Sequence, residues 1–288
     1  MKKEEILNLS ASFLAMSIAL VLVLVKFTAW DITDSVSILS SLVDSILDVL
    51  ISFITFLSIR ASMVPADQDH RFGHGKYQAI AALAQAIIII SSVIFVVYQA
   101  AIQMLSQSVV LEPSLGIQYM ATSLLLTSFL VVYQRYVAHK TKSIAIKADS
   151  IHYLSDIFTN IAVIVSLLFS SYLDSNRFDI IVGIFLMIIV LYSVKNILFE
   201  SLNILSDREL DDELREKIKI IVLSHASCLG VHDLRTRDGG SNKFIQFHME
   251  MDPEMTLEQV HRVDDEITEA LGLLIPECEV IIHMDPKR

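Results

Sequence analysis

The chain has 288 residues, of which 53% are hydrophobic and only 19% charged, and its formal net charge is −11 at pH 7. This composition argues against a wholly water-soluble protein and is typical of a membrane protein with a smaller soluble part. Most of the negative charge, −9, falls on residues 207–288, which disfavours nucleic acid as a partner and favours cations.

Six apolar stretches come first along the chain, and each approaches or exceeds the roughly 20 residues that cross a hydrocarbon core. They are residues 8–29, 35–60, 78–104, 115–135, 151–172 and 179–200. We therefore expect an all-α bundle of six membrane-spanning helices, with residues 1–206 as the transmembrane domain. No small-residue cleavage pattern follows the first stretch, so we expect it to remain in the mature protein.

The orientation of these spans follows from the distribution of Lys and Arg. Basic residues gather at the N-terminus and in the segments 60–77 and 135–150. The positive-inside rule then predicts an inner or plasma membrane protein with both termini in the cytoplasm. Lys26 lies near the end of the first span, and we expect its side chain to extend to the outer interface.

The second span carries Asp44 and Asp48, and the fifth carries His152 and Asp156. A spacing of four residues places each pair on one face of a helix. Each carboxylate at membrane depth opposes insertion by about 2.5–3.5 kcal/mol, which indicates a function. Three carboxylates and one imidazole are enough for a tetrahedral divalent-metal shell. Structural contacts between helices, or a proton relay without metal, remain the alternatives.

The segment between the second and third spans holds a second group of possible metal ligands. These are Asp67, His70 and His74. Gly73 and Gly75 permit a tight backbone path around one ion. The alternative is an ordinary solvated loop, and by composition Asp69 would fit as well as Asp67.

Beyond residue 207 the pattern changes to that of a soluble domain. We expect a helix at 211–226, strands at 231–237 and 243–251, a helix at 257–272 capped by Thr256, and a strand at 278–285. The order αββαβ predicts a small α+β domain, residues 207–288, with helices covering one face of the sheet.

Histidines are concentrated in this domain. The candidate ligands are His232, His248, His261, His283 and Asp285. Strand side chains alternate between faces, so those on the strands should lie opposite the apolar residues that meet the helices. His261 flanks the apolar stripe of its helix and could reach the same place. Histidines exposed by chance are the alternative, and we assign no role to His139 or His225.

Together these motifs resemble the cation diffusion facilitator family, and residues 65–76, 232–237 and 244–251 are closest to its bacterial ferrous-iron/zinc efflux branch. The resemblance implies a homodimeric antiporter in the lipid bilayer that exports divalent metal in exchange for protons, with a ferredoxin-like or metallochaperone-like cytoplasmic domain. It implies a transport site of Asp44, Asp48, His152 and Asp156, a loop site of Asp67, His70 and His74, a binuclear cytoplasmic site of His232, His248, His261, His283 and Asp285, and an inter-subunit charge pair of Lys76 and Asp207.

The resemblance also bears on the metal. Relatives that are stricter for zinc have His at the position of Asp44, so the Asp here favours broader selectivity, with Zn²⁺ and Cd²⁺ ahead of Fe²⁺. Two other classes of protein stay open at this point. An intramembrane metalloenzyme is disfavoured because the chain has no His-Glu-X-X-His motif. A metal-sensing signalling protein would explain the tail but not the charges at membrane depth.

Overall fold

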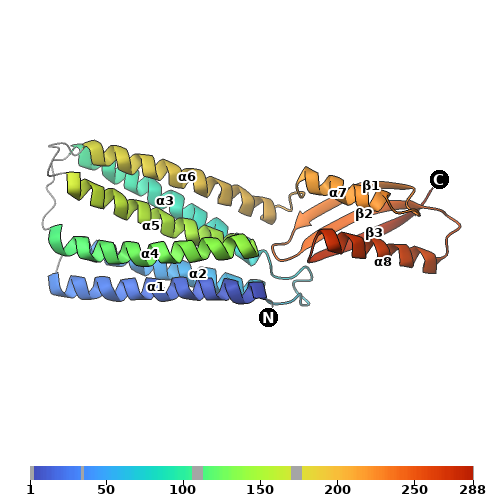
Figure 1. Ribbon diagram of the computed structural model, residues 1–288, viewed down its shortest axis with the longest axis horizontal. Helices are drawn as coiled ribbons and strands as arrows, with labels where there is room; N and C mark the ends of the chain where they lie inside the picture. Colours follow the sequence, from blue (N-terminus) through green and yellow to red (C-terminus); the bar gives the residue numbers. More distant parts are fainter. Residues whose placement is uncertain (1–2, 34–35, 106–112, 170–176, 288) are drawn as a thin grey trace. The chain divides into compact units, whose positions relative to one another are not determined.

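The computed structural model describes residues 3–33, 36–105, 113–169 and 177–287 (Figure 1). The chain divides into two compact units. The first comprises residues 1–63 and 77–201, and the second comprises residues 64–76 and 202–288. The segment between the second and third helices therefore folds with the C-terminal unit.

All six predicted spans form helices. They are α1 (Lys3–Thr33), α2 (Val36–Ser62), α3 (Tyr77–Leu105), α4 (Pro113–Thr141), α5 (Ile144–Phe169) and α6 (Arg177–Leu205). Within the described residues, α1, α2, α3 and α6 are each long and apolar enough to cross a membrane. Residues 35 and 170–172 of the predicted stretches lie outside the described residues.

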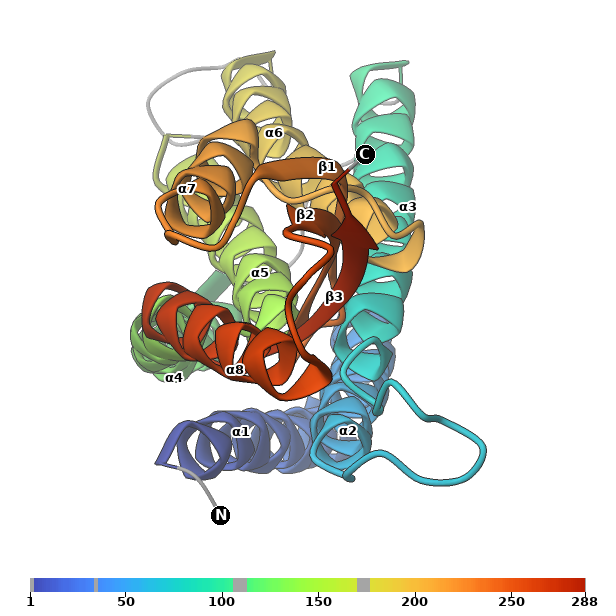
Figure 2. The same ribbon diagram turned by 90° about the vertical axis from the view of Figure 1, so that its right-hand side faces the viewer.

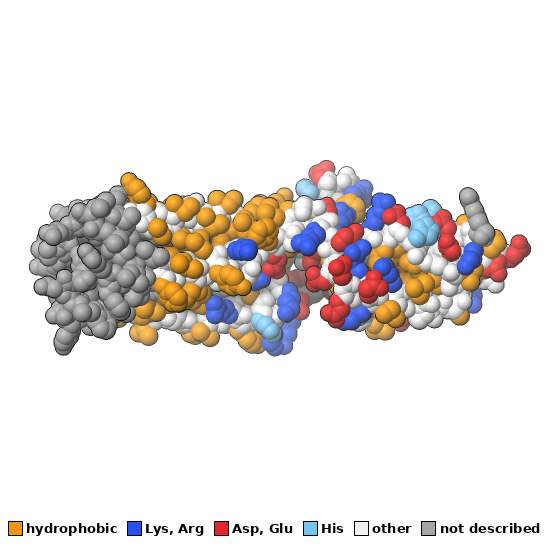
Figure 3. All heavy atoms as spheres, turned by 90° about the horizontal axis from the view of Figure 1, so that it is seen from above, with side chains coloured by type: hydrophobic (Ala, Val, Ile, Leu, Met, Phe, Trp, Pro, Cys, Tyr) orange, Lys and Arg blue, Asp and Glu red, His pale blue; other side chains and the backbone are white. Residues whose placement is uncertain are grey.

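The helices of the first unit bury polar, small and some large apolar side chains against one another, and many other large apolar side chains face outward. Helix α1 packs on α2 and α4, and α5 packs on α4, α3 and α2. Apolar side chains such as Leu24, Phe129 and Tyr192 are largely exposed, and Figure 3 shows this apolar surface over the helices. An outward apolar surface with polar groups inside is the arrangement that a hydrocarbon environment requires.

The second unit confirms the predicted αββαβ order. Its elements are α7 (Asp212–Leu223), β1 (Gly230–Asp238), β2 (Lys243–Met251), α8 (Leu257–Leu274) and β3 (Cys278–Pro286). Thr256 caps α8 as predicted, in a capping box with Gln259.

The three strands form one sheet in the order β1-β2-β3, with β1 antiparallel and β3 parallel to β2. Helices α7 and α8 lie on the same side of this sheet (Figure 2). Their apolar residues meet alternate residues of β2 in one core, which comprises Ile218, Val222, Ile245, Phe247, Met249, Met251, Val263, Ile267, Leu271 and Ile275. The opposite face of the sheet is left uncovered by these helices.

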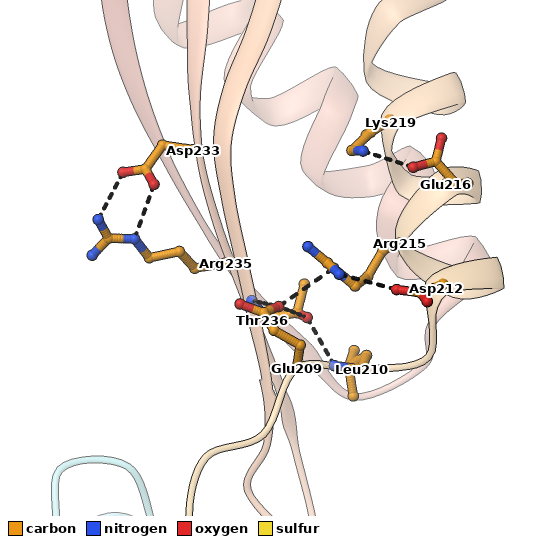
Figure 4. Close-up of polar contacts among 9 residues, drawn as sticks. All are labelled: Glu209, Leu210, Asp212, Arg215, Glu216, Lys219, Asp233, Arg235 and Thr236. Atoms are coloured by element: carbon orange, nitrogen blue, oxygen red, sulfur yellow. Dashed lines mark hydrogen bonds and ion pairs between the residues drawn. The ribbon is translucent and has the colours of Figure 1, made fainter.

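A network of hydrogen bonds around Glu209 joins the segment before α7 to strand β1 (Figure 4). Its Oε2 accepts hydrogen bonds from the backbone N and the Oγ1 of Thr236, at 2.8 and 2.5 Å. The backbone N of Leu210 donates to the same Thr236 Oγ1 at 3.0 Å, and Arg215 of α7 lies 3.5 Å from Glu209. These contacts hold the start of α7 against β1.

Candidate metal centre

The first candidate centre lies between α2 and α5. His152 Nε2 is 3.0 Å from Asp48 Oδ1 and 3.9 Å from Asp156 Oδ2. Each of the three residues offers one ligand atom within 4.8 Å of the others, and the exposed fraction of His152 is only 8%. Two helices thus present an imidazole and two carboxylates at the mutual distances that one divalent cation could bridge.

Asp44, the fourth residue predicted for this centre, lies one turn before Asp48 on α2 and outside the group of three. The structure therefore brings together three of the four predicted ligands. Its carboxylate is on the same helix face as Asp48, as the four-residue spacing predicted.

Polar contacts next to the centre hold the helices in place. The hydroxyls of Ser52 on α2 and Tyr153 on α5 are 2.8 Å apart, and both residues are fully buried. Gln85 of α3 donates to Thr55 of α2. Since these bonds are buried, each fixes the distance between two helices more firmly than the same bond in water would.

The side chain of Lys26 does not extend to the outer interface as predicted. Its Nζ donates to Ser45 Oγ at 2.6 Å, and Ser45 is 1% exposed, so the ammonium turns inward to α2 rather than outward to the interface. It lies within electrostatic reach of Asp44, Asp48 and Asp156. The apolar stretch around Lys26 gave no sign of this contact, because it does not specify which helix packs beside it.

The second candidate centre is the segment 64–76. Asp67 Oδ2 lies 3.4 Å from His74 Nε2, and Asp67 Oδ1 lies 3.5 Å from His70 Nδ1. The backbone N–H groups of His70 and then of Asp69 donate to this carboxylate, which lowers the pKa of Asp67 below its usual range. The carboxylate is therefore ionised and available for a cation, and Asp69 contributes its backbone rather than its side chain.

This segment is fastened to the β1–β2 hairpin. The guanidinium of Arg237 lies 4.2 Å from the ring centroid of Phe72 and 4.8 Å from that of Phe244, and the two rings meet edge to face. Lys76 Nζ donates to Asp207 Oδ1 at 2.8 Å. The structure forms this charge pair within one chain; its inter-subunit arrangement stays a prediction.

The third candidate centre lies on the uncovered face of the sheet. In the strand register His232 pairs with His248, and His248 pairs with His283, so three imidazoles form one row across the sheet. Asp285 closes the row: its Oδ2 is 2.9 Å from His248 Nδ1 and 3.4 Å from His232 Nε2, and its Oδ1 is 3.3 Å from His283 Nε2. The hydrogen bond from His248 lowers the pKa of Asp285, which keeps this ligand ionised. Histidines gather visibly on the surface of this unit in Figure 3.

His261 does not join this row within one chain. It lies on α8 beside Asp264 and Asp265, with Nε2 3.8 Å from Asp265 Oδ2. Because α8 packs on the face of the sheet opposite the histidine row, its side chains cannot reach that row from the same chain. Asp233, which the sequence analysis missed, lies at a bulge after His232, 3.9 Å from His248 Nε2.

Comparison with known proteins identifies the family of this chain. Residues 12–206 match the model of the cation efflux transmembrane domain, and residues 210–287 match that of the cation efflux protein cytoplasmic domain. The chain belongs to the cation diffusion facilitator family. The resemblance seen in the sequence is thus confirmed, and the protein is a membrane transporter of metal cations.

Individual relatives cover nearly the full chain. The cation-efflux pump FieF of Serratia proteamaculans is 39% identical over 277 residues, which are 96% of this chain and 92% of that protein. FieF of Escherichia coli K12 / DH10B is 40% identical over 276 residues, with the same coverage. A solved structure of the transporter CzrB matches 27% of this chain and 99% of its own, at 32% identity and a TM-score of 0.27.

The contact between the loop and the hairpin of this transporter can be tested at Gly75. A Cβ there would overlap the backbone of Gly239 and Ser241. Overpacking of this kind costs about 1–3 kcal/mol, so Gly75→Ala should speed amide hydrogen exchange of residues 66–76 by roughly tenfold or more. Gly272→Ala, which meets open space on α8, is the control and should leave that exchange unchanged. Unaltered exchange in Gly75→Ala would show that the loop is not held by the hairpin.

The histidine row can be tested at Asp285. Asp285→Asn removes the one carboxylate that all three imidazoles face, so we expect Zn²⁺ affinity of the cytoplasmic domain to fall by at least about tenfold. Isothermal titration calorimetry on the purified transporter measures this change. Glu279→Gln on the same strand, outside the row, should retain wild-type affinity; equal affinities for all three proteins would contradict the site.

Proposed function

We propose that this protein exports Zn²⁺, Cd²⁺ and Fe²⁺ from the cytoplasm in exchange for protons. The transport site would comprise Asp44, Asp48, His152 and Asp156. The observation that carries this proposal is the group formed by the buried His152 and the half-buried Asp48 and Asp156 between two helices of the first unit. Ionisable groups inside a membrane-spanning bundle are costly, and ion pathways are where they occur.

Proton coupling follows from the chemistry of the ligands. A divalent metal needs deprotonated carboxylates and a neutral imidazole, so metal and protons compete for the same atoms. His152 is the natural group for this exchange, because an imidazole titrates closest to cytoplasmic pH. If the site opens alternately to each side of the membrane, inward protons displace the metal on the outer side.

The choice of metals rests on the donor set. Three carboxylates and one imidazole suit Zn²⁺, Cd²⁺ and Fe²⁺, and geometry rather than affinity order decides among them. The relatives named as cation-efflux pumps support a cation substrate without naming the metal. With Asp44 rather than a histidine as the fourth ligand, we expect Zn²⁺ and Cd²⁺ to be preferred over Fe²⁺.

We further propose that residues 1–206 form the transport domain and residues 207–288 a metal-binding dimerisation domain, in an inner membrane with both termini cytoplasmic. The basic residues of the 60–77 and 135–150 segments support this orientation. The tail carries a net charge of −9, so two tails repel each other until metal ions bind between them. In such a dimer His261 could reach the partner's histidine row, and Lys76 and Asp207 could pair between subunits.

The transport site is tested at Asp48. Asp48→Ala should abolish Zn²⁺ uptake into inverted membrane vesicles driven by a pH gradient, because it removes the carboxylate nearest to His152. Size-exclusion chromatography should show the same oligomer as wild type. Asp31→Asn, at the exposed end of α1, is the matched control and should transport normally.

Undiminished transport by Asp48→Ala would contradict the assignment of this transport site. The same assay, performed in liposomes with an imposed pH gradient, separates the transporter from the two other protein classes. A metalloenzyme or a metal-sensing signalling protein would show no Zn²⁺ flux coupled to the gradient.

The proposed approach of the two tails on metal binding is tested at His248. Zn²⁺ should draw two wild-type tails together, measured as energy transfer between fluorophores attached to them. His248→Ala should lose this response because it removes the centre of the histidine row. His225→Ala, which changes a tail histidine outside the row, should respond as wild type does. A full response in His248→Ala would show that the histidine row does not draw the tails together.

A further inference from the structure

A buried pair of an amide and a carboxyl group lies between α4 and α5, apart from the four proposed metal ligands. Gln134 and Asp149 are both 0% exposed. Gln134 Nε2 donates to Asp149 Oδ2 at 2.5 Å. Asp149 lies three residues before His152 on α5, so it occupies the neighbouring turn of the same helix.

The pair leaves two oxygen atoms without a partner. Gln134 Oε1 and Asp149 Oδ1 are both buried and lack hydrogen bonds within the part of the chain that the structure describes. Both are acceptors as long as the carboxyl group is ionised, so neither can satisfy the other. Unpaired buried acceptors are rare in folded proteins, and a buried charge with a single hydrogen bond is rarer still.

A single proton on Asp149 Oδ1 would give both unpartnered oxygen atoms a hydrogen bond. A primary amide and a carboxylic acid form a ring of two hydrogen bonds, N–H to one oxygen and O–H to the amide oxygen. The first of these bonds is present, and the atoms that would form the second are the two that lack partners. A proton on Oδ1 would also make the buried group neutral, which its low-dielectric surroundings favour.

We propose that Asp149 is a proton-binding site of this transporter and carries its proton when the transport site is empty. The proposal rests on the proposed function and adds to it a proton carrier that is not itself a metal ligand. Other groups that act electrostatically on Asp149 are His152 on its own helix and Asp48 on α2, and the Tyr153 hydroxyl is influenced by it.

The charge at these neighbours determines when Asp149 releases its proton and when it takes one up. A divalent cation at Asp48 and His152 adds positive charge one helical turn away, which favours the ionised form of Asp149. The O–H bond then breaks, the carboxylate keeps the electron pair and the proton passes to water. When the metal leaves, the acid takes a proton back, so Asp149 adds one proton to each exchange cycle.

The decisive experiment counts protons. Zn²⁺ alone is titrated into the purified full-length protein in weakly buffered solution, and the protons released per bound Zn²⁺ are measured. Asp149→Asn keeps a donor for Gln134 Oε1 and an acceptor for Gln134 Nε2, so it mimics the protonated acid and should fold. We expect it to bind Zn²⁺ but to release one proton fewer than wild type. Asp31→Asn is the control and should release as many as wild type.

A spectroscopic measurement on the wild type needs no variant. Infrared difference spectra with ¹³C-labelled aspartate should show a carboxylic acid C=O band in the metal-free protein that disappears with Zn²⁺. Absence of this band from the metal-free protein, its persistence with Zn²⁺ bound, or equal proton release by wild type and Asp149→Asn would overturn the proposal. Those results would leave metal efflux intact, whereas full transport by Asp48→Ala would overturn the transport site independently.

Discussion

The contact between His152 and Asp48 is the interaction on which the first unit depends. Charged groups inside a membrane-spanning bundle must be paired, because lipid offers them no hydrogen-bond partners. Pairing them across α2 and α5 fixes how these helices face each other, and the buried bond between Ser52 and Tyr153 maintains that orientation. The same contact brings carboxylate oxygen and imidazole nitrogen atoms together between the two helices.

The second unit is built differently and exposes candidate metal ligands on one face of its sheet. Both helices lie on one face of a three-stranded sheet, so the other face is free to present a row of imidazoles. The loop of residues 64–76 belongs to this unit, and Arg237 contacts the rings of both Phe72 in the loop and Phe244 in β2. Two of the three candidate metal centres therefore belong to one compact unit. Metal bound at either of them stabilises the same folded unit.

Several side chains were beyond reach of sequence reasoning, and the reasons are physical. Lys26 was expected at the outer interface because a hydropathy pattern does not contain the neighbouring helix whose Ser45 accepts its hydrogen bond. Asp149 lies between recognisable motifs, and its significance depends on Gln134, a residue on another helix. His261 was expected to reach the other histidines because it flanks the apolar stripe of its helix, yet α8 covers the opposite face of the sheet. Asp233 gained its position from a bulge that strand periodicity cannot foresee.

The sequence by itself determined the elements, the alternation of faces and the pairs of ligands on single helices. These are local properties: apolar runs of membrane length, the four-residue helical repeat and the two-residue strand repeat place Asp48, His152 and the row of His232, His248 and His283 on defined faces. Only the tertiary structure decided which faces meet. It placed Asp44 outside the group of the other three candidate ligands, attached the loop to the C-terminal unit and left Gln134 Oε1 and Asp149 Oδ1 buried without a hydrogen-bond partner among the described residues. Contacts between elements depend on helix rotation and strand register, and neither is encoded in any single segment.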